Sequence, residues 1–78
     1  MLTLKMIEMT SGKVVYGYYP EDESEYGIIS ANIRTGEMKV EKIAENDKYR
    51  RYLSHAMSRL EELVQNSTYE NKVTVAWC

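Results

Sequence analysis

The chain has 78 residues, with 10 basic and 12 acidic side chains, a formal net charge of −2, and 44% hydrophobic residues. This length predicts a single domain over residues 1–78, and the slightly acidic balance argues against general nucleic-acid binding and against a basic membrane-binding patch. A domain this short buries only about 60% of its unfolded surface, so association with a second copy is a natural supplement to its core.

Cysteine use and the N-terminal segment predict the compartment. The one cysteine, Cys78, rules out an intrachain disulfide and a zinc-binding cysteine set, so we expect a cytoplasmic protein with no metal and no cofactor. The segment MLTLKMIEMT carries Lys5 and Glu8 within its apolar run, and we therefore expect neither a signal peptide nor a membrane span.

Two alternating segments open the chain and predict a β-hairpin. Residues 2–9 would place Leu2, Leu4 and Met6 on one side of a strand and Thr3, Lys5, Ile7 and Met9 on the other. Residues 13–19 alternate in the same way, with Val14, Tyr16 and Tyr18 opposite Val15, Gly17 and Tyr19. The turn Thr10-Ser11-Gly12 joins them, and Pro20 ends the second strand because it has no backbone N–H to donate.

An acidic segment follows the hairpin. It carries four carboxylates in five residues, from Glu21, Asp22, Glu23 and Glu25. The ligand spacing and turn glycine of a calcium loop are absent, so we expect no metal site. A solvated loop is the simpler interpretation, and an ion pair with the basic residues of the helix described below is the alternative.

A second hairpin is predicted from residue 26 to residue 43. Residues 26–33 would place Ile29, Ala31 and Ile33 on one side and Tyr26, Ile28, Ser30 and Asn32 on the other. The turn Arg34-Thr35-Gly36-Glu37 predicts a positive φ at its glycine. The fourth strand continues with Met38, Val40 and Ile43.

Residues 46–66 form the one segment with sustained helical periodicity. Its apolar stripe comprises Tyr49, Leu53, Ala56, Met57, Leu60, Leu63 and Val64. We expect Asn46 or Asp47 to cap the start of the helix, and Asn66 to take a left-handed conformation at its end. After a loop, Val73, Val75 and Trp77 predict a last strand.

These elements predict an α+β fold. The order is β-β-β-β-α-β, an antiparallel sheet of four to five strands with one helix packed on one face. The sequence leaves open where the last strand joins the sheet and which face the helix covers. The other face would keep apolar and tyrosine side chains uncovered, which is typical of an interaction surface.

The helix carries its charges against the helix dipole. Lys48, Arg50 and Arg51 would lie in the first turn and Glu61 and Glu62 near the end, where each costs about 0.3–1 kcal/mol at low salt. Solvation of long side chains is the simpler interpretation. The alternative is that a second copy packs antiparallel and supplies the opposite charges.

The sequence therefore favours a small protein-interaction module that acts without catalysis, as a homodimer or with another protein. The residues expected to carry this contact are Tyr16, Tyr18, Tyr26 and Ile28 on the open sheet face, and Arg50, Arg51, Glu61 and Glu62 on the helix flank. The alternative function is a nucleic-acid-associated regulator, comparable to a small antitoxin protein. It would use the basic side of the helix, formed by Lys48, Arg51, Tyr52 and Arg59.

No catalytic residue is assigned. His55, the one histidine, lies off the apolar stripe without an orienting carboxylate within one turn, so an enzymatic role for it is the weakest alternative. Cys78 has no feature that would lower its thiol pKa, and Trp77 is expected to close the edge of the core.

Overall fold

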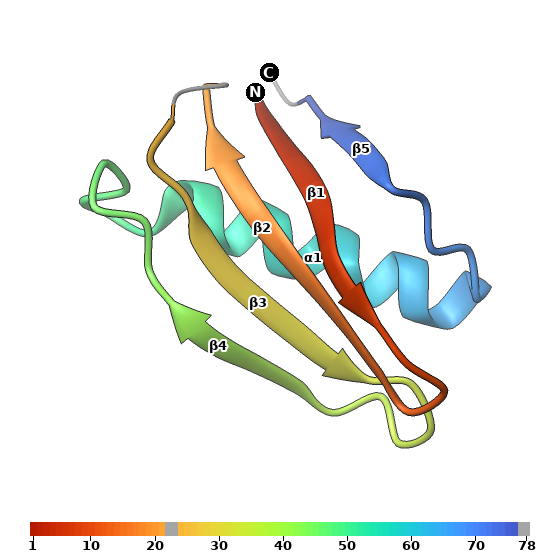
Figure 1. Ribbon diagram of the computed structural model, residues 1–78. Helices are drawn as coiled ribbons and strands as arrows, with labels where there is room; N and C mark the ends of the chain where they lie inside the picture. The colour runs from red at the N-terminus through yellow and green to blue at the C-terminus, as the bar shows by residue number, and fades with distance from the viewer. Residues whose placement is uncertain (22–23, 77–78) are drawn as a thin grey trace.

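The computed structural model describes residues 1–21 and 24–76, which form five strands and one helix (Figure 1). The strands are β1 (Leu2–Met9), β2 (Lys13–Pro20), β3 (Gly27–Asn32), β4 (Met38–Lys42) and β5 (Lys72–Val75), and the helix is α1 (Arg51–Asn66). The expectations for Asp22, Glu23, Trp77 and Cys78 concern residues outside these ranges.

All five strands join one antiparallel sheet in the order β4-β3-β2-β1-β5. The helix α1 packs across one face of this sheet, and Figure 1 shows it behind the strands. The predicted α+β fold is therefore confirmed. The last strand, whose place the sequence left open, lies at the edge of the sheet, where residues 72–75 pair with residues 2–5 of β1.

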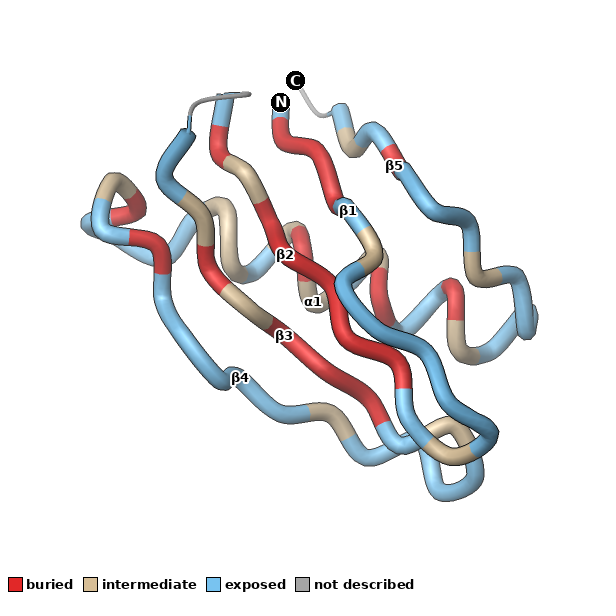
Figure 2. The backbone as a smooth tube through the Cα atoms, in the orientation of Figure 1, coloured by how far each residue is buried: buried red, intermediate tan, exposed pale blue. Residues whose placement is uncertain are grey.

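The hydrophobic core lies between α1 and the side of the strands that carries Leu4, Tyr18 and Ile29. Its buried residues are Leu2, Leu4, Val14, Tyr16, Tyr18, Ile29, Ala31, Ala44, Ala56, Leu60, Leu63 and Val73. Figure 2 shows the buried positions concentrated on the three central strands, with β4 and β5 mostly exposed. Each fully buried leucine contributes about 1.5–3 kcal/mol, so this one layer supplies most of the folding free energy.

Tyr16 and Tyr18 are core residues, and their predicted place on an open interaction face is wrong. Both are 0% exposed, because α1 covers the face of β2 to which they belong. Their hydroxyl groups bond to backbone inside the protein: Tyr16 donates to the carbonyl of Glu70 (2.6 Å), and Tyr18 accepts from the N–H of Ala44 (2.9 Å). Burial raises the pKa of both hydroxyls.

Two bulges interrupt the strict alternation of the strands. In β1 the register shifts between Met6 and Glu8, so that Met9 lies opposite Val14 on the side that α1 covers. The prediction that Met9 shares a side with Thr3 and Lys5 is therefore wrong. In β4 the shift leaves Glu41 as the extra residue, between positions that pair with Ile28 and Ile29. The glycine of the predicted second turn, Gly36, has the expected positive φ of 80°.

The helix begins later than its periodicity predicts. Residue 51 is its first residue, so Lys48 and Tyr49 lie in the preceding loop, and Tyr49 is 88% exposed instead of joining the apolar stripe. Asp47 nevertheless caps the helix, because its carboxylate accepts the N–H groups of Tyr52 (3.2 Å) and Leu53 (2.9 Å). The chain reaches this geometry through Arg50, which has a left-handed φ of 56°.

The end of α1 also differs by one residue. Asn66 is the last helical residue, and Ser67 takes the left-handed conformation that we predicted for Asn66. The N–H groups of Ser67 and Thr68 return to the carbonyls of Val64 and Leu63, and so close the last turn. The four-residue loop that follows, residues 68–71, then leads into β5.

Candidate functional site

The sheet face that α1 does not cover, called the open face below, has no packing partner among the described elements. Tyr26 and Ile28, predicted to lie there, do so and are half-buried. The centre of the open face is closed by small or short side chains, since Thr3, Val15 and Ser30 are all less than 9% exposed. Longer side chains surround this centre and determine what the face can bind.

One cross-strand row of the open face carries three lysines. Lys5 lies opposite Lys72 on β5 and opposite Gly17 on β2, Gly17 lies opposite Ile28 on β3, and Ile28 lies opposite Lys42 on β4. Residues directly opposite one another in an antiparallel sheet project from the same face. Lys5, Lys42 and Lys72, called the lysine row below, are all exposed.

Two stacked tyrosines lie beside the lysine row. The rings of Tyr19 and Tyr26 are 4.9 Å apart between centroids and inclined by 22°. The Nζ of Lys5 is 4.5 Å from the centroid of the Tyr19 ring, and the Nζ of Lys42 is 4.7 Å from that of Tyr26. Lys5, Tyr19 and Lys42 come from β1, β2 and β4, and Tyr26 directly precedes β3, so a cation lies at each end of an aromatic pair.

Gly17 makes room for this pair. A Cβ atom added at Gly17 would lie 3.1 Å from Tyr19 Cε1, 3.4 Å from Tyr26 Cδ2 and 3.5 Å from Ile7 Cδ1. Both rings therefore lean over the glycine instead of standing away from the sheet. The two rings stack face to face across the strands, with a lysine ammonium over one ring at each end of the pair.

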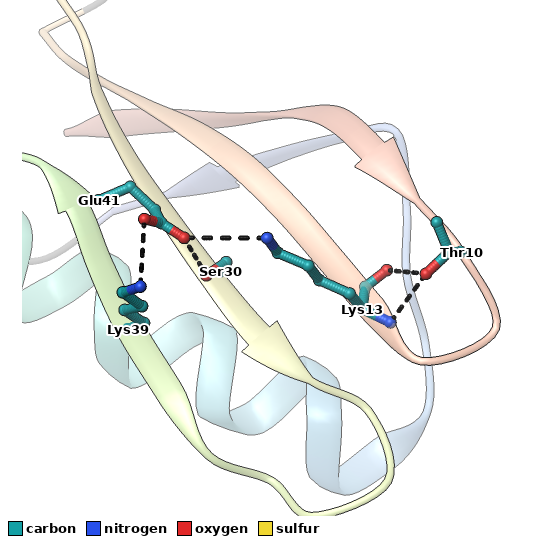
Figure 3. A network of polar contacts seen from close by, with 5 residues as sticks. All are labelled: Thr10, Lys13, Ser30, Lys39 and Glu41. Carbon is teal, nitrogen blue, oxygen red and sulfur yellow. Dashed lines mark hydrogen bonds and ion pairs between the residues drawn. The ribbon is translucent and has the colours of Figure 1, made fainter.

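At one end of the open face, two lysines lie close to a carboxylate. Glu41 lies 3.9 Å from the Nζ of Lys13 and 3.8 Å from that of Lys39, and it accepts a hydrogen bond from Ser30 (3.1 Å), as Figure 3 shows. Ser30 and Glu41 also line a hollow of about 200 Å³. At this end one carboxylate serves two ammonium groups, so the three side chains keep one excess positive charge.

The lysine row, by contrast, has no ion pair with any carboxylate among residues 1–21 and 24–76. Two of its members, Lys5 and Lys72, lie directly opposite each other. Like charges in that position destabilise a sheet. An anion on this part of the open face would relieve the repulsion, because it would lie within reach of both cations.

The basic side of the helix is less available than the sequence predicts. Arg59 is paired with Glu62 (Nη1 to Oε1, 2.6 Å), and the hydroxyl of Tyr52 donates to Glu21 (2.8 Å), a bond that raises the pKa of Tyr52. Lys48 precedes α1 and Arg51 is its first residue. Two of the four predicted nucleic-acid contacts are therefore already engaged by carboxylates of the same chain.

The residues predicted to form the interaction flank of the helix are likewise only partly available on one helical surface. Arg50, Arg51, Glu61 and Glu62 are exposed, but Glu62 is held by Arg59 and Arg50 belongs to the turn before the helix. Lys48 and Arg51, with Tyr49 and Tyr52, line an open hollow of about 310 Å³. At this end of α1, Asp47 already accepts the backbone N–H groups of Tyr52 and Leu53.

His55 is half-buried on α1. Within the described ranges, no three or more histidine, cysteine, aspartate or glutamate side chains are grouped closely enough to hold a metal ion. The one helix described is too short and too polar to cross a membrane.

Comparisons with protein-family models, with curated proteins and with solved structures found no significant match.

Sequence reasoning missed the residues that make the open face distinctive, namely Lys5, Gly17, Tyr19, Lys42 and Lys72. The alternation of β1 and β2 did separate Lys5 from Leu4, and Gly17 and Tyr19 from Tyr18, which was the available signal. What the alternation could not supply was the register, since only the pairings of β5 with β1 and of β4 with β3 bring the three lysines into one row.

Proposed function

We propose that this protein is a binding module without catalysis of its own, and that it holds an anionic macromolecule against the open face of its sheet. The observation that carries the proposal is the lysine row, three exposed cations in one cross-strand row without an ion pair among the described residues. Cations fixed on a sheet are preorganised, so an extended anion can contact all three at once.

The charge of the open face argues for a partner other than a second copy of the chain at this surface. Two open faces packed together would bring both lysine rows into one interface, where like charges cost several kcal/mol. The homodimer and the cytoplasmic location stay predictions from the sequence. A homodimer formed through the helix flank would use Arg50, Arg51 and Glu61 and would leave the open face free for the anion.

Replacement of the three lysines of the row by neutral glutamine tests the proposal, because it removes their positive charges without introducing negative ones. A cation close to an anionic surface contributes about 1 kcal/mol. Lys5→Gln, Lys42→Gln and Lys72→Gln combined should therefore weaken binding of a heparin oligosaccharide about 100-fold at low salt. Calorimetric titration at two salt concentrations measures the dissociation constants, and wild-type binding should weaken as salt rises.

The matched control removes three cations from around the start of α1, on the other side of the sheet. The variant combining Lys48→Gln, Arg50→Gln and Arg51→Gln has the same net charge as the row variant and should stay within about threefold of the wild-type affinity. Equal losses in the two variants would show a general charge effect and contradict the proposal. A wild-type protein that binds no heparin at low salt would contradict it outright.

A further inference from the structure

We infer that the anion held on the open face is single-stranded nucleic acid, with bases stacked on Tyr19 and Tyr26 and phosphates bound by the lysine row. This inference rests on the proposed function and adds the chemical class of the partner. It differs from the nucleic-acid site predicted on the helix, because it uses the opposite side of the molecule and shares no residue with that site.

A lysine ammonium group lies over each of the two rings, 4.5 Å from the Tyr19 centroid and 4.7 Å from the Tyr26 centroid. Tyr19 and Tyr26 cover each other's inner faces. Lys5 approaches Tyr19 from β1 and Lys42 approaches Tyr26 from β4, on opposite sides of the pair in the strand order. No carboxylate holds either ammonium in place among the described residues. Rotation of one lysine side chain would therefore open a ring face to a base.

The strengths of the two interactions favour replacement of the lysine by a base on each ring. An exposed cation–π contact strengthens an interaction about two- to fivefold. Stacking of one base on an aromatic side chain is worth about five- to 150-fold by alanine substitution. An ammonium that leaves a ring also remains close enough to pair with a phosphate of the same strand. Each ring thus exchanges a weak contact for a stronger one, and each lysine gains an anionic partner.

The size of the surface fits a short single strand. The lysine row crosses four inter-strand gaps of about 4.8 Å, about 19 Å in all, and single-strand sites on sheet surfaces commonly take about 4–16 nucleotides. A duplex hides the faces of its bases in the stack, and an acidic protein has no bases to stack. Neither would make use of the ring faces of Tyr19 and Tyr26.

The test compares two anions of matched charge, fluorescein-labelled dT15 and a labelled polyglutamate, by fluorescence anisotropy at low salt. The variant combining Tyr19→Leu and Tyr26→Leu keeps apolar side chains over Gly17 but removes the rings. We expect it to weaken dT15 binding at least tenfold and polyglutamate binding less than twofold. The variant combining Tyr19→Phe and Tyr26→Phe should retain dT15 binding within about twofold, since the rings remain.

Two further measurements keep the inference open to refutation if the leucine variant folds poorly. Tyr49→Leu removes the most exposed tyrosine on the opposite surface and should leave dT15 affinity unchanged. In the wild-type protein, dT15 should shift the NMR ring-proton resonances of Tyr19 and Tyr26 upfield, as base stacking requires.

The outcomes separate this inference from the proposed function. Equal affinity for dT15 and polyglutamate, with no effect of the tyrosine variant on either, would overturn the nucleic-acid inference and leave the anion-binding open face in place. Tighter binding of a 15-base-pair duplex than of dT15 would also overturn it. Unchanged binding of both probes by the Lys5, Lys42 and Lys72 variant would overturn the proposed function itself.

Discussion

Replacement of Gly27 by alanine is expected to destabilise the folded protein by about 3 kcal/mol. A Cβ atom at this position would overlap the ring of Tyr18 at Cε1 and lie 2.6 Å from the carbonyl oxygen of Lys42. Neither neighbour can move cheaply, because Tyr18 is fully buried with its hydroxyl bonded to the Ala44 N–H, and the carbonyl belongs to the backbone of β4. The substitution therefore forces the loop after β4 away from the core.

Urea unfolding followed by circular dichroism measures this effect, and Gly12→Ala is its matched control. A Cβ atom at Gly12 meets nothing within 4 Å, and Gly12 has an ordinary φ, so the control should change the free energy of unfolding by less than about 0.5 kcal/mol. If Gly27→Ala proves as stable as Gly12→Ala, the tight packing of Tyr18 between β3 and the loop after β4 is not the structure in solution.

Asp47→Ala should cost about 2 kcal/mol of folding stability, at the upper end of the range for helix caps. The Asp47 side chain is 4% exposed and accepts two N–H groups, from Tyr52 and Leu53, that have no helical partner. Alanine would leave both donors to be satisfied by water at a partly buried helix end. Asp47→Asn retains one acceptor oxygen and should cost about half as much.

Thermal and urea unfolding of these variants, with Glu45→Ala as the control, tests the role of the cap. Glu45 is an exposed carboxylate two residues away, so its removal changes the charge as Asp47→Ala does, without removing a hydrogen bond to α1. We expect Glu45→Ala to stay within about 0.5 kcal/mol of the wild-type stability. Similar losses in Glu45→Ala and Asp47→Ala would mean that local charge, rather than capping, determines the effect.

The fold was predictable because the alternation of side chains along a strand can be recognised from a few consecutive residues. The sides of β2 and β3 followed directly from their side chains, and Gly36 signalled its turn because only glycine takes a positive φ easily. The bulges at Ile7 and Glu41 carry no such signal. An extra residue in one strand is defined by its partner strand, so the true place of Met9 could not be derived from β1 alone.

The start of the helix shows how tertiary contacts override periodicity. The apolar stripe extended to Tyr49, yet the loop before α1 is shaped by Asp47, whose carboxylate reaches five and six residues forward to the helix N–H groups. A cap so far from the first helical residue requires the left-handed turn at Arg50, which is uncommon for a residue other than glycine. Sequence spacing favours a nearer cap, and the predicted boundary was therefore too early.

The candidate site was harder to predict than the fold for a related reason. Tyr16, Tyr18 and Tyr19 are close in sequence and chemically alike, but α1 covers the side of Tyr16 and Tyr18 and leaves Tyr19 on the open face. Alternation separates the two sides without showing which one the helix covers. The lysine row also joins residues from three strands, Lys5, Lys42 and Lys72, and so it exists only once the register is known.

The most direct test of the account is a map of backbone amide chemical shifts in the isotope-labelled protein as a heparin oligosaccharide is added at low salt. An anion on the open face should shift the amides around Lys5, Gly17, Ile28, Lys42 and Lys72 most strongly. Residues 48–52, at the start of the helix, should shift little. Shifts concentrated on residues 48–52 instead, or the absence of any saturable shift on the open face, would contradict the account.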